Sequence, residues 1–357
     1  MITKEEVLSA LGHVEEPDLK KDLVTLHMIE DLKIEGSHIS FSVVLTTPAC
    51  PLKNMIENAC RNAIKHFVSA DASVDIKMTS RVTSQKNQSL SKINNIIVVA
   101  SGKGGVGKST VSANLALALA RQGAKVGLVD ADVYGPSIPI MFGLENARPM
   151  AMETGDGKTK IVPVEKYGIK ILSIGFFTNP DQPVPWRGPM ASNAVKQLFN
   201  DAEWGELDYL VVDLPPGTGD IHITLTQSYP VAGAVIVTTP QNVALSDTRK
   251  GIAMFMMNAI NVPILGIIEN MSYFTPAELP EHKYYIFGQG GGRKIAEQFE
   301  APFLGEIPLV QGISEAGDAG EPVVLQENNP TAEAFMEVAG KVAQQVSIRN
   351  AETVKSF

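Results

Sequence analysis

A glycine-rich segment, SGKGGVGKST at 101–110, constrains this chain more than any other feature. It fits the pattern G-x-x-x-x-G-K-[ST], whose fixed positions here are Gly102, Gly107, Lys108 and Ser109. It follows IIVVA at 96–100, a continuous apolar run typical of a strand buried on both faces. Apolar residues at helical spacing follow over 109–122. A strand, a glycine loop and a helix in this order predict a phosphate-binding loop.

The residue types in this loop suit a triphosphate. Glycines let the backbone curl so that successive N–H groups point at phosphate oxygens, and the following helix adds its positive end. The residues expected to surround the phosphates are Gly102, Gly104, Gly105, Val106 and Gly107. Lys108 is expected to neutralise the β- and γ-phosphates, and Ser109 to offer its hydroxyl to Mg²⁺, with Thr110 as the next hydroxyl in line. We therefore predict ATP and Mg²⁺ as ligands.

The rest of this region alternates strands with helices. Further apolar runs predict buried strands at 125–130, 209–214, 233–239 and 264–270. Helical stretches lie between several of them and at 330–347. This alternation predicts an α/β fold, a doubly wound and mostly parallel sheet of the P-loop NTPase kind, with its ligand at the carboxyl ends of the strands. We assign this domain to 95–350.

Residues 1–81 form a different pattern. Strand signals at 24–29, 38–45 and 73–79 surround an amphipathic helix at 52–67, which predicts a small α+β domain. The segment 82–94 is polar and has no periodic apolar set, so we interpret it as a linker.

Three aspartates stand at predicted strand ends. Asp130 and Asp132 follow one strand, and Asp213 ends another, directly before Pro-Pro-Gly-Thr-Gly. Asp213 has the form of a carboxylate that holds Mg²⁺ through water. Gly217 and Gly219 would let the backbone approach the γ-phosphate and move with it. Asp130 is either a structural carboxylate or one that supports a metal ligand.

Composition excludes several classes of protein. The net charge of −9 argues against a protein that wraps nucleic acid. No apolar run reaches the roughly 18–20 residues of a membrane helix, and the first ten residues lack the layout of a secretion signal. Two cysteines exclude a disulfide framework. We expect a soluble, cytoplasmic protein with no nucleic-acid or membrane partner.

Longer strings resemble one group of P-loop ATPases. The form K-G-G-x-G-K-[ST], with Lys103 near its start, resembles the deviant-Walker ATPases. The strings DADVYGPSIP, WRGPM, DLPPGTGD and ENMSYF narrow this to the Mrp/ApbC family over about 96–345. The resemblance implies a homodimer closed by nucleotide, in which Lys103 reaches the partner's nucleotide. It also implies that Asp132 positions the hydrolytic water and that Asn270 contacts the adenine.

The N-terminal region adds a second resemblance. The turn T-x-P-x-C-P, which is TTPACP at 46–51 and contains Thr47 and Cys50, is similar to that of PaaD/SufT-like domains. Both parts imply an ATPase that carries iron–sulfur clusters and delivers them to apoproteins. Cys50 lies at the start of the predicted helix, where we expect a lowered thiol pKa and a metal or cluster ligand; the alternative is a small buried residue. Cys60, in mid-helix, is expected in the core.

One departure from the family leaves the function open. After ENMSYF, the family's C-x-x-C pair is absent, and 275–292 reads TPAELPEHKYYIFGQGGG. Because iron–sulfur clusters are held mainly by thiolates, binding of a [4Fe–4S] cluster by this chain alone is in doubt. The alternatives are a partner-dependent assembly ATPase that binds no cluster, or a Par- or Min-type positioning ATPase.

Overall fold

The computed structural model describes residues 2–84, 92–154, 157, 159–178, 185–276, 278–279 and 281–355. Contacts divide the chain into two compact units, Ser84–Val342 on one side and Met1–Thr83 with Ala343–Phe357 on the other. The expected boundaries, 1–81 and 95–350, stay a prediction. Most of the expected linker, 85–91, lies outside the described residues.

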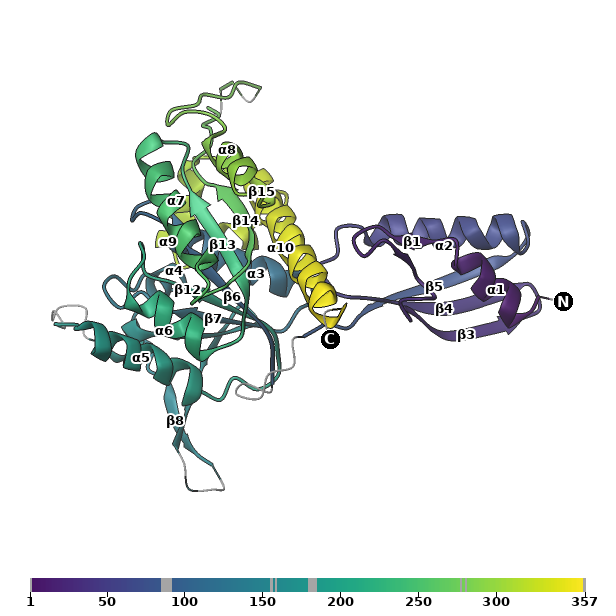
Figure 1. Ribbon diagram of the computed structural model, residues 1–357, viewed down its shortest axis with the longest axis horizontal. Helices are drawn as coiled ribbons and strands as arrows, with labels where there is room; N and C mark the ends of the chain where they lie inside the picture. Colours follow the sequence, from purple (N-terminus) through teal and green to yellow (C-terminus); the bar gives the residue numbers. More distant parts are fainter. Residues whose placement is uncertain are drawn as a thin grey trace. The chain divides into compact units, whose positions relative to one another are not determined.

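An eight-stranded sheet forms the centre of the larger unit (Figure 1). Its order is β10-β11-β7-β12-β6-β13-β14-β15, and every neighbouring pair is parallel except β10 with β11. In this order the strands are Val164–Lys166, Ile169–Ser173, Val126–Asp130, Leu207–Asp213, Ile93–Ala100, Val231–Thr238, Ile264–Glu269 and Phe303–Glu306. The predicted mostly parallel α/β fold is confirmed.

Helices follow the strands and pack on the sheet. α3 packs against β7 and β12, α7 against β13, and α8 against β14. The helices of this unit are α3 (Lys108–Arg121), α4 (Ile138–Met141), α5 (Gly188–Asn200), α6 (Asp220–Ser228), α7 (Asn242–Met256), α8 (Gly291–Gln298), α9 (Gln311–Asp318) and the start of α10 (Pro330–Lys355). The short helices η2 (Ile174–Phe177) and η3 (Val323–Leu325) and the hairpin β8 (Met150–Glu153) and β9 (Thr159–Val162) complete it.

The smaller unit is an α+β fold with its own core. β3 (Ile29–Glu35), β4 (His38–Leu45) and β5 (Ser73–Ser80) form a sheet, with α1 (Lys4–Leu11) and α2 (Lys53–Phe67) beside it. A two-stranded ladder joins β1 (Glu15–Glu16) to β2 (Lys21–Asp22). The end of α10 belongs to this unit, where the Gln344 side chain donates to Asp18 over 2.6 Å.

The strand predicted at 24–29 is wrong, because tight turns occupy most of it. The N–H of Leu26 donates to the carbonyl of Asp22, and that of Thr25 to the Asp22 carboxylate. His27 has a positive φ of 53°, which breaks an extended strand. Only Ile29 of the predicted range belongs to a strand, β3.

None of the helices in the described part of the chain is both long and apolar enough to cross a membrane.

Candidate functional site

The phosphate loop joins the carboxyl end of β6 to the start of α3. Gly105 and Gly107 both adopt a φ of +80°, a conformation that side chains disfavour. A Cβ on Gly107 would lie 2.2 Å from Nδ2 of Asn270. A Cβ on Gly102 would lie 2.2 Å from the backbone carbon of Asp247 in α7. The loop therefore needs glycine at both fixed positions, for conformation and for close approach.

Lys108 and Ser109 meet Asp213 at the foot of this loop. The Lys108 ammonium lies 2.8 Å from Oδ1 of Asp213, and the Ser109 hydroxyl donates to Oδ2 over 2.6 Å. The side chain of Asp213 is fully buried and that of Lys108 is 6% exposed. A buried carboxylate needs such partners, because an unpaired one costs several kcal/mol. The three residues are therefore already assembled beside the cradle of loop amides.

Ser112 completes this cluster and was missed from the sequence. Its hydroxyl lies 2.6 Å from Oδ1 of Asp213 and 3.0 Å from the carbonyl oxygen of Lys108, and its side chain is fully buried. The available signal was its spacing in α3, since residues three and four apart on a helix share a face. Ser112 follows Ser109 by three positions and Lys108 by four.

Asp130 sits beside Asp213, where β7 and β12 end in register. The carboxylate of Asp130 accepts from the Ser173 hydroxyl over 2.9 Å and from the backbone N–H groups of Asp132 and Ile138. Burial, with the negative charge of Asp213 as a smaller cause, raises the pKa of Asp130 to about 7. Ser173, which ends the neighbouring strand β11, was also missed from the sequence.

Asp132 lies farther out, beyond the end of β7. One of its carboxylate oxygens is 3.8 Å from the Lys108 ammonium, and the other accepts from the N–H of Gly135. Burial raises the pKa of Asp132, while the charge of Lys108 opposes that rise. Four predicted residues, Lys108, Ser109, Asp132 and Asp213, thus meet at one edge of the sheet.

Lys103 stands apart from this cluster, exposed at the outer side of the loop. Its carbonyl oxygen accepts from the hydroxyl of Ser101, which fixes the backbone and leaves the side chain in solvent. The neighbouring Gly104 and Gly105 are exposed too, so the segment 103–105 of the phosphate loop faces solvent.

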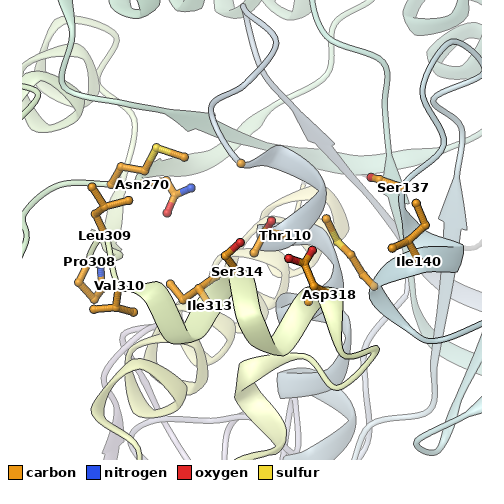
Figure 2. Close-up of a pocket in the computed structure, with 14 residues that line it drawn as sticks. Thr110, Ser137, Ile140, Asn270, Pro308, Leu309, Val310, Ile313, Ser314 and Asp318 are labelled. Carbon is orange, nitrogen blue, oxygen red and sulfur yellow. The ribbon is translucent and has the colours of Figure 1, made fainter.

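A cavity of about 400 Å³ adjoins the other end of the phosphate loop (Figure 2). Figure 2 shows Thr110 of α3 facing Ser314 of α9, with Asn270 and Leu309 at one end and Ser137 and Ile140 at the other. Asn270 is buried, and its Nδ2 donates to the carbonyl of Val106 over 2.8 Å. Its amide nitrogen thus holds the phosphate loop, while the side chain lines the cavity.

The wall of this cavity formed by 308–318 was missed from the sequence. It follows the end of β15. The sequence signal that could have located it is the apolar segment APFLGEIPL at 301–309, because ligands of parallel sheets bind beyond the carboxyl ends of strands.

The two cysteines belong to the smaller unit. Cys50 is half-buried and precedes α2, yet burial raises the pKa of its thiol, and the backbone N–H groups of Leu52 and Lys53 oppose the rise only in part. The expected lowering of this pKa is therefore wrong. Cys60 lies in the core as expected, and burial raises its pKa to about 12. Within the described ranges, no group of three or more His, Cys, Asp and Glu side chains is arranged to hold a metal.

Two families match the chain. The family described as NUBPL iron-transfer P-loop NTPase matches residues 92–343, and the family described as iron-sulfur cluster assembly protein matches residues 4–77. An iron-sulfur cluster carrier protein of Synechocystis is 48% identical over 98% of this chain and 99% of its own length. A protein of the same name from Deinococcus radiodurans is 46% identical over 96% and 95%.

One solved structure resembles the larger part of the chain. It is a nucleotide-binding protein from Archaeoglobus fulgidus in complex with ADP, 38% identical, with a TM-score of 0.57. The similarity covers 68% of this chain and 92% of the archaeal one.

Proposed function

Because this chain belongs to the NUBPL iron-transfer P-loop NTPase family, we propose that it binds and hydrolyses ATP with Mg²⁺ and carries or assembles iron–sulfur clusters for delivery to apoproteins. The buried cluster of Lys108, Ser109 and Asp213 beneath a glycine loop is the observation that carries the ATPase part. The cluster-carrier part is supported by the names of the full-length relatives.

The residues at the site fit a Mg²⁺–triphosphate. A hydroxyl from Ser109 and a carboxylate from Asp213 are the oxygen donors that Mg²⁺ prefers. Mg²⁺ would be held by Ser109, with Asp213 acting through water, and when bound it neutralises charge on the β- and γ-phosphates. Lys108, now paired with Asp213, would turn its ammonium towards those phosphates.

Asp132 is proposed to orient the attacking water. Its carboxylate is the most exposed of the three aspartates at this edge, and it lies near Lys108 without displacing Asp213. Replacement of a positioned base or orienting group typically costs about 100-fold or more in rate. We expect Asp132→Asn to retain nucleotide binding and to lose hydrolysis by that order.

The adenine is proposed to enter the cavity beside Asn270. Since Nδ2 of Asn270 is engaged with Val106, the carbonyl oxygen of its side chain is the group left to accept from the adenine amino group. Apolar side chains of Leu309 and Val310 line the same cavity and suit a flat base.

Nucleotide is further proposed to close a homodimer through Lys103. The exposure of this lysine and the open upper side of the loop allow it to reach a second subunit. The domain boundaries at 1–81 and 95–350 are part of the same proposal.

A second candidate function is a partner-dependent assembly ATPase that holds no cluster itself. The observation that favours it is the sequence of 275–292, which lacks cysteine, so that thiols come only from Cys50 and Cys60. The raised pKa of both thiols disfavours thiolate and points the same way.

Two assays test these functions. ATP hydrolysis with Mg²⁺ should be lost in Lys108→Ala and kept in the control variant Lys250→Ala, because Lys250 is exposed on α7. Equal activity in both variants would refute the assignment of the ATPase site to the loop that contains Lys108. Anaerobic reconstitution, followed by iron and sulfide counting on the intact chain and on Cys50→Ala, separates a carrier from an assembly ATPase. Cluster lost in Cys50→Ala supports a carrier that uses Cys50, and no cluster in either supports the assembly role.

A further inference from the structure

The cavity proposed to hold the adenine also carries polar side chains for which that proposal gives no role. Its volume of about 400 Å³ lies within the range of roughly 300–1,000 Å³ that is typical of sites enclosing a whole small molecule. Asn270 and Leu309 line one end, and Ser314 and Asp318 of α9 line the part that faces Thr110 (Figure 2). A base at the Asn270 end leaves the two polar side chains of α9 for another part of the ligand.

The chemistry of ATP decides which part of the nucleotide would meet α9. The ribose joins the base to the α-phosphate, so it must lie between the adenine and the phosphate loop. Thr110 follows Ser109 in the first turn of α3, directly after that loop, and its side chain lines the cavity. The sugar would therefore lie between Thr110 and the side of α9 that faces it.

Ser314 and Asp318 are available to bind such a sugar. Both side chains are exposed, and neither makes a hydrogen bond or an ion pair with another residue that the structure describes. They stand four positions apart and so share one face of the helix. Figure 2 shows their oxygen atoms on the side of α9 that faces Thr110. Together they offer a carboxylate, which accepts hydrogen bonds, and a hydroxyl, which both donates and accepts.

Asp318 occupies a position that its own helix disfavours. It is the last residue of α9, and the carboxyl end of a helix carries a partial negative charge that repels a carboxylate. Residues that go against such a local preference are expected mainly at functional sites. The placement of this aspartate therefore indicates a role outside the helix.

The turn after Asp318 is held firmly, so the carboxylate is placed before any ligand binds. Gly320 has a φ of +74°, and a Cβ there would lie 2.6 Å from the backbone nitrogen of Gly143, just beyond α4. The hydroxyl of Tyr167 donates to the carbonyl of Gly320 over 3.1 Å. A group that recognises a ligand needs support of this kind to act at a fixed geometry.

We propose that Asp318 is a specificity-determining residue that accepts hydrogen bonds from the 2′- and 3′-hydroxyls of the ribose, with the Ser314 hydroxyl as a second contact to the same sugar. A carboxylate has two oxygens and can accept from two neighbouring hydroxyls at once. A deoxynucleotide lacks one of these donors and leaves the carboxylate partly unpaired, so the protein selects ribonucleotides. This inference rests on the proposed binding of ATP.

Calorimetry on the full chain measures this selection. The ligands are the Mg²⁺ complexes of ADP, 2′-deoxy-ADP and 3′-deoxy-ADP, which the proposed ATPase does not hydrolyse. Since a hydrogen bond to a charged group corresponds to roughly tenfold or more in affinity, we expect the parent to bind ADP about tenfold more tightly than either deoxy analogue. In Asp318→Ala the three affinities should become nearly equal. Ser314→Ala should weaken the binding of ADP by about two- to tenfold, the contribution of one neutral hydrogen bond.

The matched control is Glu315→Ala. It removes the same charge from the same helix, but Glu315 is exposed and is not among the residues that line the cavity. We expect it to keep the parent's preference for ADP, so that a general effect of charge on nucleotide binding is separated from contact with the sugar.

The outcomes distinguish this inference from the proposed function. Equal affinity of the parent for all three nucleotides, or an unchanged preference in Asp318→Ala, overturns the ribose contact and leaves the phosphate-binding site intact. An equal loss of preference in Asp318→Ala and Glu315→Ala also overturns it, and an unchanged ADP affinity in Ser314→Ala removes the second contact. Failure of the parent to bind ADP at all overturns both this inference and the proposed nucleotide site.

Discussion

Removal of the Ser112 hydroxyl tests the buried cluster around Asp213. The hydroxyl has one proton, and the shorter of its two contacts, 2.6 Å to the Asp213 carboxylate, is charge-assisted. A hydrogen bond to a charged group contributes about 1.5–3 kcal/mol. Replacing serine by alanine inside a helix stabilises the folded state by about 0.5 kcal/mol, because alanine has the higher helix propensity. We therefore expect Ser112→Ala to lower the free energy of unfolding by about 1–2.5 kcal/mol.

Urea unfolding followed by tryptophan fluorescence measures this change. Both tryptophans of the chain, Trp186 and Trp204, lie in the larger unit, so the signal reports on the part that contains Ser112. The control is Ser246→Ala, an exposed serine inside α7 that undergoes the same propensity gain without losing a buried partner. If the two variants agree within about 0.5 kcal/mol, the hydrogen bond to Asp213 does not stabilise the site, and the reasoning is refuted.

Three further predictions concern other groups. Asp130, with its pKa raised to about 7, holds a proton in the folded state that the unfolded chain releases near pH 4, so its contribution to stability falls as pH rises from about 4 to 7. Urea unfolding at pH 5 and 7.5 should show this fall in the parent relative to Asp130→Asn, and parallel pH profiles would contradict it. Lys103→Ala should bind nucleotide as the parent does, yet stay monomeric on size-exclusion chromatography with a non-hydrolysable ATP analogue. If the variant forms a dimer, Lys103 is not needed at the proposed dimer interface. Cys60 should resist iodoacetamide at pH 7.5 until the protein unfolds, and Cys50 should react more slowly than a free thiol; fast labelling of the folded protein, read by mass spectrometry, would show the thiols to be accessible thiolates.

The sequence predicted those parts of the site that local pattern determines. The phosphate loop and Asp213 each adjoin a long apolar run, and a buried strand followed by a loop places them at the same sheet edge. Ser173 could not be predicted in this way, because its approach to Asp130 depends on the register of β11 against β7. β11 is a short strand paired on its other side with the antiparallel edge strand β10.

The errors have similar physical causes. The apolar residues at 24–29 favoured a strand, but the carboxylate of Asp22 accepts a hydrogen bond from the N–H of Thr25 and stabilises a turn there. The helix start beside Cys50 favoured a low thiol pKa, but desolvation outweighs the backbone N–H groups. At 24–29 a short-range hydrogen bond, between residues three positions apart, outweighed the apolar pattern. At Cys50 the burial that only the folded chain creates outweighed the local preference.

The proposed function depends on the binding of a Mg²⁺–triphosphate by the glycine loop at 101–110. Isothermal titration calorimetry of a non-hydrolysable ATP analogue, with Mg²⁺, into the parent protein and Lys108→Ala tests this most directly. We expect saturable binding at one site per chain in the parent and no measurable binding in Lys108→Ala, with Lys250→Ala unchanged. Equal affinity in the parent and Lys108→Ala, or no heat in any of them, would contradict it.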